Sequence, residues 1–541
     1  MQFQAMFKVA VMAVGLLAGH AAAQDLRSGD AAAPAATRHA PDPLAEVYLV
    51  SSRETYRQAI QQVAHQASSH RDGAGRNLVI SQVRQYQLPI VSGAIHQREN
   101  RCGGFFAFDS RAQAEDFIRS DRTAQAMLAA PVAYTIDNQA TVEPWLPQVD
   151  DAAIKATIDE LSAYRNRYYA SPHGQAAAES IRDRWQALAD GRSDVTTTLF
   201  TACPGCSTQP SVILTIAGSD LADEIVVLGA HLDSINGGGG GGDEQVAPGA
   251  DDDASGIATL TEVLRVALAG DWRPRRTVMF MGYAAEEVGL RGSNAIANAF
   301  RDSGQDVVGV LQLDMTNYRL GTGVDMQVIT DYSNAAMKQF LGDLFDAYLA
   351  PLGLTRGRYT CGYGCSDHAS WTSAGYPSAM MFEAGDENGN YFPYIHSSSD
   401  TMANMGDSAA NSAKFARFGL AFLGELGKTA SDDGDTDGGA LANGVAVDGI
   451  GKTSGSITFH LDVPARSTRL VFTISGGSGN ADLYMKRGSV PTDVSFDCRP
   501  LKPGNAEACG LAVPRAGTYY VKLKANPSFE GVSLKASYRA R

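Results

Sequence analysis

The sequence predicts an α/β domain with a mainly parallel, mixed sheet flanked by helices. A folded N-terminal region precedes this domain, and a small β-sandwich follows it. Three observations lead to this prediction. Between residues 134 and 428, short apolar runs alternate with segments of helical periodicity, as expected when a sheet is buried on both faces. Residues 442–541 alternate apolar and polar side chains between regular turns, which is typical of a sandwich. The length of 541 residues exceeds that of one ordinary domain.

The composition is that of a globular protein whose partners are not nucleic acids. Hydrophobic residues make up 44% of the chain and charged residues 19%. The formal net charge is -14 and no run of basic residues occurs, whereas phosphate binding requires clustered Lys and Arg.

Residues 1–23 have the pattern of a signal peptide. Lys8 precedes a short apolar run over 9–18, and small residues follow at 21–23. The run is too short to span a bilayer, which requires ~20 apolar residues. The alternative is a buried helix, but we expect a secreted, extracellular protein without a membrane span.

Residues 24–133 are interpreted as a pro-region, so the chain would be a zymogen. They begin with an Ala/Pro-rich stretch and continue with helical and strand-like segments that contain none of the metal-type motifs described below. A permanent N-terminal domain is the alternative.

The seven cysteines suit a secreted protein, in which disulfides persist. Cys102 is left alone, which is explained if its segment is removed during maturation. The CPGC spacing also occurs in redox and metal sites, but we favour a structural disulfide. Three local pairs are visible: Cys203 with Cys206, Cys361 with Cys365, and Cys498 with Cys509.

The elements of the central domain follow from their apolar patterns. On the predicted helix over 254–270, Ile257, Leu260 and Val263 lie on one face with Leu264 and Ala267. The expected strands cover 224–230, 275–284, 307–315, 324–331 and 376–384. The other expected helices cover 292–300, 333–353 and 411–427.

A polar linker is predicted over 429–441. Its carboxylate spacing resembles a calcium loop but lacks the terminal glutamate of such loops, so we favour a plain linker. The expected strands of the sandwich cover 455–464, 468–476, 481–488, 517–525 and 532–538.

Metal-ligand residue types stand in five short motifs, most of them at the ends of predicted strands. The carboxyl ends of strands meet at one edge of an open α/β sheet, which brings distant residues together. Two imidazoles and three carboxylates suit a pair of zinc-like ions, and a spare glutamate beside a ligand glutamate can act as a general base. The pattern therefore predicts a two-metal hydrolase. Its residues are His231, Asp252, Glu286, Glu287, Asp314 and His396.

The motifs GAHLDS, APGADDDASG, YAAEEVGLRGS, LQLDMTNY, CGYGCSDHASW and IHSSSDT, in this order, resemble the secreted bacterial leucyl aminopeptidases. These are co-catalytic di-zinc exopeptidases, and the resemblance runs from about residue 140 to 428. The segment 480–509 resembles the bacterial pre-peptidase C-terminal domain. The glycine-rich rim over 237–242 and the CPGC pair depart from the family pattern.

The resemblance implies a role for each site residue. Asp252 would bridge two zinc ions, with His231, Glu287, Asp314 and His396 as further ligands. Glu286 would be the general base, and Asp233 would hydrogen-bond the ring of His231. Tyr363 would reach the substrate carbonyl from a loop closed by a disulfide between Cys361 and Cys365.

The expected substrates are the N-termini of peptides and proteins, with a broad preference for leucine-like residues. The candidate pocket residues, which ordinary core packing would also explain, are Met315, Ile329, Met380, Phe382 and Ile395. We expect a monomer in which the pro-region acts as an intramolecular inhibitor or folding aid. Another amidase or carboxypeptidase on the same site, and a non-catalytic surface-binding protein, are the alternatives. Cobalt or manganese could take the place of zinc.

Overall fold

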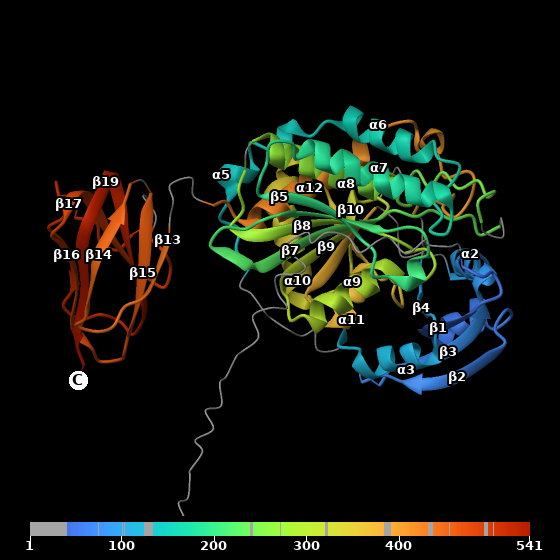
Figure 1. Cartoon of the computed structure of the whole chain (residues 1–541), viewed down its shortest axis with the longest axis horizontal. Coiled ribbons are helices and arrows are strands. Elements are labelled where there is room, and N and C mark those ends of the chain that lie inside the picture. The colour runs from blue at the N-terminus through green and yellow to red at the C-terminus, as the bar shows by residue number, and fades with distance from the viewer. Residues whose placement is uncertain are drawn as a thin grey trace, which may run out of the picture.

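The computed structural model describes residues 41–540, with gaps at 74, 100, 102, 124–133, 239–241, 271, 320–322, 384–390, 431–435, 454, 492–495 and 501. The predicted signal peptide and Cys102 lie outside the described residues. We call residues 41–123 the N-terminal unit, 134–430 the central domain and 436–540 the C-terminal unit (Figure 1). In the described part of the chain, no helix combines the length and apolarity needed to cross a bilayer.

The central domain is built on an eight-stranded mixed sheet in the order β11-β10-β12-β9-β7-β8-β6-β5. The four middle strands β12, β9, β7 and β8 run parallel, and β6 and β5 continue the sheet antiparallel at one edge. The strands are β5 Val195–Phe200, β6 Ser211–Ile216, β7 Leu221–His231, β8 Arg276–Tyr283, β9 Asp306–Leu313, β10 Met326–Ile329, β11 Arg356–Tyr359 and β12 Ser378–Phe382.

Helices cover both faces of this sheet. Figure 1 shows α6, α7, α8 and α12 on one face and α9, α10 and α11 on the other. The helices are α5 Gln139–Val142, α6 Asp151–Ser162, α7 Pro172–Leu188, α8 Ala254–Ala269, α9 Arg291–Asp302, α10 Ala335–Leu344, α11 His368–Ala374 and α12 Ala410–Gly427. The largest apolar cluster among the described residues lies beneath the first group, where Trp185, Phe280 and Phe418 are fully buried.

The predicted strands and helices of the central domain are confirmed. Most residues of the middle strands are apolar because helices bury both faces, and these apolar runs made the strands visible in the sequence. Strands β5, β6 and β11 and helices α5, α6, α7 and α11 were not predicted. The run VTTTLF of β5 is short, polar and only half-buried at the sheet edge, which hides this strand in the sequence. Helix α10 ends at Leu344, and a π-helical turn over Phe345–Leu349 continues the predicted segment.

The N-terminal unit is a four-stranded sheet in the order β2-β3-β1-β4 with two longer helices. Its inner face shares one continuous apolar cluster with the central domain. In that cluster Leu49, Val91 and Ile95 pack with Tyr169 and Ile235. The elements are β1 Glu46–Ser52, β2 Gln66–Arg71, β3 Asn77–Arg84, α2 Leu88–Glu99, β4 Phe105–Phe108 and α3 Arg111–Ser120, with short helical turns at α1 Arg53–Thr55, Tyr56–Ile60 and Gln85–Gln87.

The C-terminal unit is a seven-stranded β structure with its own apolar core. The long strand β19 pairs with β14, β15, β16 and β17 and so joins the layers. The strands are β13 Thr436–Ala440, β14 Ala446–Lys452, β15 Ser456–Val463, β16 Thr468–Ser475, β17 Ser478–Arg487, β18 Glu507–Leu511 and β19 Gly517–Arg539.

One boundary prediction was wrong at this junction. The predicted linker over 429–441 contains β13, which pairs in parallel with β15. A side chain at Gly438 would place its Cβ 2.3 Å from the ring of Phe459, so the glycine lets this ring cover the strand. The polar, glycine-rich composition of the strand resembles that of a linker, which is why the sequence did not reveal it.

Candidate metal centre

The predicted ligands follow strands that are neighbours in the sheet. His231 ends β7, the turn with Glu286 and Glu287 follows β8, and Asp314 follows β9. Because β9, β7 and β8 are parallel neighbours, their carboxyl ends place these side chains at one edge. Asp252 comes from the loop before α8, and His396 comes from the loop after β12.

Asp252 lies between the two histidines. Its Oδ1 is 3.0 Å from Nε2 of His231, and its Oδ2 is 3.2 Å from Nε2 of His396. Asp314 Oδ1 lies 3.5 Å from the same nitrogen of His231. Glu287 Oε2 lies 2.8 Å from Nε2 of His396. Each oxygen of one carboxylate thus faces a different imidazole.

Two groups of ligand atoms result, and they share Asp252. One group consists of His231, Asp252 and Asp314, and the other of Asp252, Glu287 and His396. All five side chains are buried, and among the described residues these are the two groups of His, Cys, Asp or Glu with metal-site geometry. A carboxylate shared by two such groups can bridge two cations.

Several of the donor atoms at this site form no hydrogen bond within the protein. Oxygen atoms of Asp252, Glu287 and Asp314, together with Nε2 of His396, are buried without a hydrogen bond. Buried charges in natural proteins are paired or bind metals. The mixture of imidazole and carboxylate donors suits zinc. The residues present therefore fit a pair of metal ions.

The electrostatics of the cluster favour added positive charge. Burial opposes protonation of His231 and His396, but the surrounding carboxylates outweigh it and hold both pKa values well above the ordinary value. Burial alone would raise the pKa of Asp252, yet the two histidines hold that pKa below its usual range. Cations bound at the same place would offset the same negative charge of the carboxylates.

Glu286 is buried beside the cluster, and its Oε1 has no hydrogen-bond partner. Burial raises the pKa of this carboxyl well above its ordinary value, and the nearby carboxylates of Asp367, Glu287 and Asp314 raise it further. A raised pKa suits a group that must accept and later donate a proton near neutral pH.

Asp233 supports the turn that carries both glutamates. Its carboxylate accepts hydrogen bonds from the backbone N–H of Glu286 at 2.9 Å and of Glu287 at 3.2 Å. Its Oδ1 lies 3.5 Å from Nδ1 of His231, whereas the backbone carbonyl of Asp233 is closer to this nitrogen, at 3.1 Å. Asp233 thus positions three groups of the site, two through its carboxylate and the His231 ring mainly through its backbone carbonyl.

Sequence reasoning missed two residues that hold the loop before Asp252. The carboxylate of Asp400 accepts from the backbone N–H of Asp251 at 2.8 Å and of Asp252 at 3.1 Å. Arg167 is fully buried and donates to the carbonyl oxygens of Leu232 and Gly249, both at 2.9 Å. Asp400 stands in the quoted IHSSSDT motif, but no sequence signal marked Arg167.

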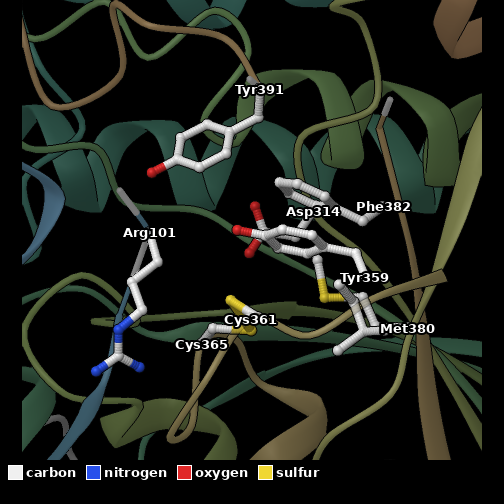
Figure 2. A pocket seen from close by; sticks show the side chains of 9 residues that line it. Arg101, Asp314, Tyr359, Cys361, Cys365, Met380, Phe382 and Tyr391 are labelled. Carbon is white, nitrogen blue, oxygen red and sulfur yellow. A yellow bond between two sulfur atoms is a disulfide. The ribbon is translucent and has the colours of Figure 1, made fainter. Parts of the chain in front are cut away.

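A small apolar cavity lies against Asp314 (Figure 2). Of the predicted pocket residues, Ile329, Met380 and Phe382 line it, whereas Met315 and Ile395 belong to the surrounding apolar cluster. The Cys361 and Cys365 pair, expected beside the site, also lines the cavity, whereas sequence reasoning missed Arg101, Tyr359 and Tyr391. The cavity has room for about one water molecule.

Tyr363 does not line this cavity. It packs instead in a cluster that contains Phe106 and Phe117 of the N-terminal unit and Tyr332 of the central domain. The disulfide between Cys361 and Cys365, which closes its loop, is present as expected.

Helix α2 of the N-terminal unit lies over the site. Ser92 Oγ donates to the backbone carbonyl of Glu287 at 2.6 Å. The His96 ring stands 5.5 Å from that of His396, and its Nδ1 lies 3.2 Å from the hydroxyl of Tyr391. Burial and the neighbouring His396 lower the pKa of His96 to about 4, which keeps it neutral near pH 7.

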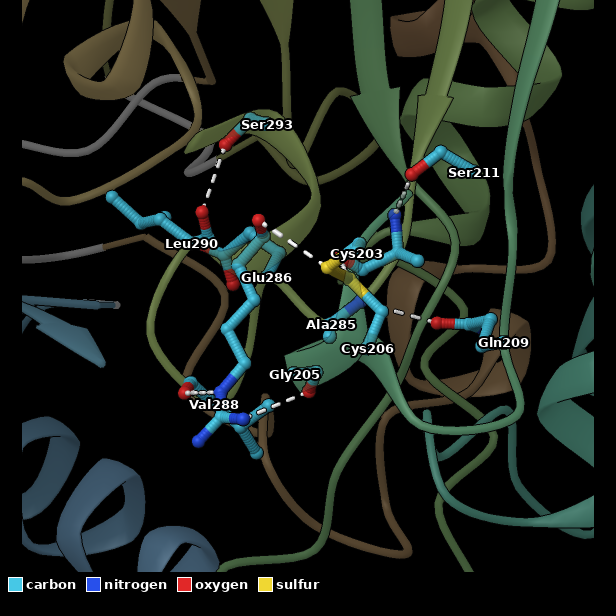
Figure 3. Close-up of a disulfide and its surroundings, with 12 residues drawn as sticks. Cys203, Gly205, Cys206, Gln209, Ser211, Ala285, Glu286, Val288, Leu290 and Ser293 are labelled. Atoms are coloured by element: carbon cyan, nitrogen blue, oxygen red, sulfur yellow. Dashed lines mark hydrogen bonds between the residues drawn. A yellow bond between two sulfur atoms is a disulfide. The ribbon is translucent and has the colours of Figure 1, made fainter. Parts of the chain in front are cut away.

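The Cys203–Cys206 disulfide packs beneath the same turn as the glutamates (Figure 3). Cys206 Sγ lies 3.9 Å from the carbonyl oxygen of Ala284, and Gln209 accepts from the backbone N–H of Ala285 at 3.1 Å. The disulfide predicted for the CPGC pair is therefore present and supports the site. The third predicted pair, Cys498 with Cys509, is confirmed in the C-terminal unit.

Fold and site together define a peptidase domain, and sequence comparison identifies its family. Residues 211–418 match the model of peptidase family M28, and residues 455–525 match the bacterial pre-peptidase C-terminal domain. A probable leucine aminopeptidase of Arthroderma benhamiae is 36% identical over 301 residues, which cover 54% of this chain and 77% of the relative. Leucine aminopeptidase 1 of Metarhizium robertsii is 35% identical, with coverage of 54% and 73%. The chain belongs to peptidase family M28.

Solved structures agree with this assignment. The LapA aminopeptidase of Legionella pneumophila superposes with a TM-score of 0.60 at 26% identity, covering 71% of this chain and 99% of that one. LapB from the same organism gives a TM-score of 0.59 at 26% identity, covering 71% and 100%. The predicted family resemblance is confirmed, and a bacterial origin stays a prediction.

Proposed function

We propose that this protein is a secreted di-zinc aminopeptidase that removes single, leucine-like residues from peptide N-termini. The observation that carries the proposal is Asp252, whose two oxygens face two separate groups of buried ligand atoms. Membership of family M28 and relatives named leucine aminopeptidase support the same activity.

The chain's own residues supply positioning and proton transfer. Zinc ions held by the two groups would polarise the substrate carbonyl and activate a water molecule. Glu286 would accept the proton of that water and deliver one to the leaving amine, a contribution typically worth about 10²- to 10⁴-fold in rate. Asp233 keeps Glu286 in place through the backbone N–H of residue 286.

The cavity beside Asp314 would receive the first side chain of the substrate. Ile329, Met380 and Phe382 give it an apolar wall. An apolar pocket discriminates by only ~1–3 kcal/mol per methylene, so we expect a broad preference among leucine-like residues. The negative surroundings would favour a free α-ammonium over a blocked N-terminus.

We further propose that the N-terminal unit is an inhibitory pro-region. Helix α2 places Ser92 and His96 against residues of the site, and Arg101 helps to line the cavity. The cavity as it stands has no room for a leucine side chain, so the unit must move or be removed before substrate binds.

Hydrolysis of leucine p-nitroanilide and of its N-acetylated form tests the activity. Both are measured with the full chain before and after limited proteolysis, with and without a chelator. We expect the treated protein to cleave only the free-amine form, with activity abolished by the chelator and restored by zinc. Cleavage of both forms would indicate a general amidase. No cleavage with two metals bound would favour a binding role.

A further inference from the structure

The loop between Cys361 and Cys365 is held by the N-terminal unit through its backbone. Arg101 Nη1 donates to the carbonyl oxygen of Tyr363 at 3.1 Å. The backbone N–H of Gly104 donates to the carbonyl oxygen of Gly364 at 3.0 Å. A Cβ added at Gly103 would lie 2.9 Å from the Gly364 oxygen, so the two backbones are in direct contact.

The ring of Tyr363 is held by aromatic and cationic groups. Phe106 of the N-terminal unit meets it edge-on, with ring centroids 6.0 Å apart and planes at 81°. Tyr332 meets it at 5.5 Å and 89°. The guanidinium of Arg76, also from the N-terminal unit, lies 6.0 Å from the Tyr363 centroid and 5.1 Å from that of Tyr332.

The hydroxyl of Tyr363 is engaged in the same network. It is hydrogen-bonded to the hydroxyl of Tyr332, which in turn accepts from Arg76 Nη1 at 2.8 Å. Arg76 is fixed by ion pairs with Asp72 and, at 2.6 Å, with Asp121. The polar end of the ring is therefore tied to the N-terminal unit.

The other side of this loop belongs to the site. Cys361 and Cys365 line the cavity, and Ser366 Oγ donates to Oδ2 of Asp314 at 2.6 Å. The residues on either side of Tyr363 are Gly362 at φ 106° and Gly364 at φ 58°. Glycine adopts many backbone conformations at little cost, so the segment can turn at both positions.

We propose that the N-terminal unit withholds Tyr363 from the site, and that its departure lets the ring turn about Gly362 and Gly364 towards the cavity. The inference rests on the proposed function, because it assigns Tyr363 a part in substrate binding. Inhibition then has two components: α2 covers the site, and the contacts of Arg76, Arg101 and Phe106 hold back one of its residues.

The test uses the full chain with 3-fluorotyrosine placed at position 363 and observed by fluorine NMR. Arg76→Gln and Phe106→Ala each remove one contact of the ring. Such contacts correspond to about two- to thirtyfold in an equilibrium between held and released states. Val79→Ala is the matched control, since Val79 is a buried residue of the same unit that belongs neither to the cluster shared with the central domain nor to the cluster of Tyr363.

We expect the fluorine resonance to shift in both contact variants and to stay unchanged in the control. Hydrolysis of leucine p-nitroanilide by the full chain should rise about twofold or more in the contact variants. This gain should disappear when Tyr363→Phe is added.

An unchanged resonance in both contact variants, or a gain that survives Tyr363→Phe, would overturn the inference. A shifted resonance without hydrolysis by any form of the protein, including the protease-treated chain, would instead overturn the proposed function. In that case the N-terminal unit would still hold Tyr363 in place, but this contact would have no link to hydrolysis. Arg76→Gln keeps the test open if Phe106→Ala fails to fold, because the Arg76 side chain is 32% exposed.

Discussion

Replacing the two adjacent glutamates separately should give opposite results for turnover and metal content. Both side chains are 4% exposed, and both Glu→Gln changes conserve size. Glu287 Oε2 faces Nε2 of His396 at 2.8 Å within a ligand group, whereas Glu286 belongs to neither group. Glu286→Gln should therefore keep both metals and lose turnover, and Glu287→Gln should lose metal.

The size of the turnover effect follows from the role proposed for Glu286. General-base catalysis contributes about 10²- to 10⁴-fold, which corresponds to about 3–5 kcal/mol of activation free energy. The stability effect has the opposite sign. Burial raises the pKa of Glu286, so the ionised group destabilises the metal-free fold at pH 7, above its unfolded pKa. A neutral amide removes this penalty, and the melting temperature of the metal-free chain should not fall.

Turnover is measured with leucine p-nitroanilide after limited proteolysis. Metal content is measured by elemental analysis of the protein. We expect two metals per chain in Glu286→Gln and about one in Glu287→Gln. Near-normal turnover by Glu286→Gln would refute its role as general base. Equal metal loss in both variants would show that the assignment of ligand and base to the adjacent positions is wrong.

Three further predictions concern other parts of the molecule. Asp252→Asn should reduce the metal content more than any other single ligand change, because both ligand groups share this residue; full occupancy would contradict bridging. Partial burial opposes ionisation of Asp194, but Arg192 and Arg273 outweigh it and lower the pKa of this carboxyl. Its ion pairs therefore stabilise the fold at pH values above the unfolded pKa of ~3.9. This stabilisation is lost as the pH falls through the folded pKa. Asp194→Asn should thus lower the melting temperature at pH 7 and weaken its acid dependence, and an unchanged pH profile would refute this. Gly438→Ala should destabilise the C-terminal unit by about 1–3 kcal/mol through a clash with Phe459 while leaving turnover unchanged, as calorimetry and the activity assay would show.

The central domain was predictable because its local and long-range signals agree. Strands such as β7 and β9 contain continuous apolar runs, over 225–230 and 307–311, and His231 and Asp314 stand at their ends. The rule that carboxyl ends of parallel strands form sites then joined residues far apart in sequence. The pairing of Asp252 with both histidines needed coordinates, since no spacing reveals which oxygen faces which ring.

Other features could not be read from the sequence because they depend on contacts between distant segments. Arg167 looks like any surface arginine, yet it is buried against the carbonyls of Leu232 and Gly249. Tyr363 was placed at the substrate by resemblance, but its position depends on Arg76 and Phe106 of another unit. Sequence periodicity describes one element at a time and contains no information about such docking.

The apolar cluster shared by the N-terminal unit and the central domain changes what a single proteolytic cut can achieve. Val91 and Ile95 would stay packed with Tyr169 and Ile235 after the peptide bond between the two parts is broken. The cut therefore turns one chain into a two-chain complex, whose lifetime depends on dissociation rather than on the protease. Activity would then appear with the departure or digestion of the released piece, later than the band shift that marks cleavage on a gel.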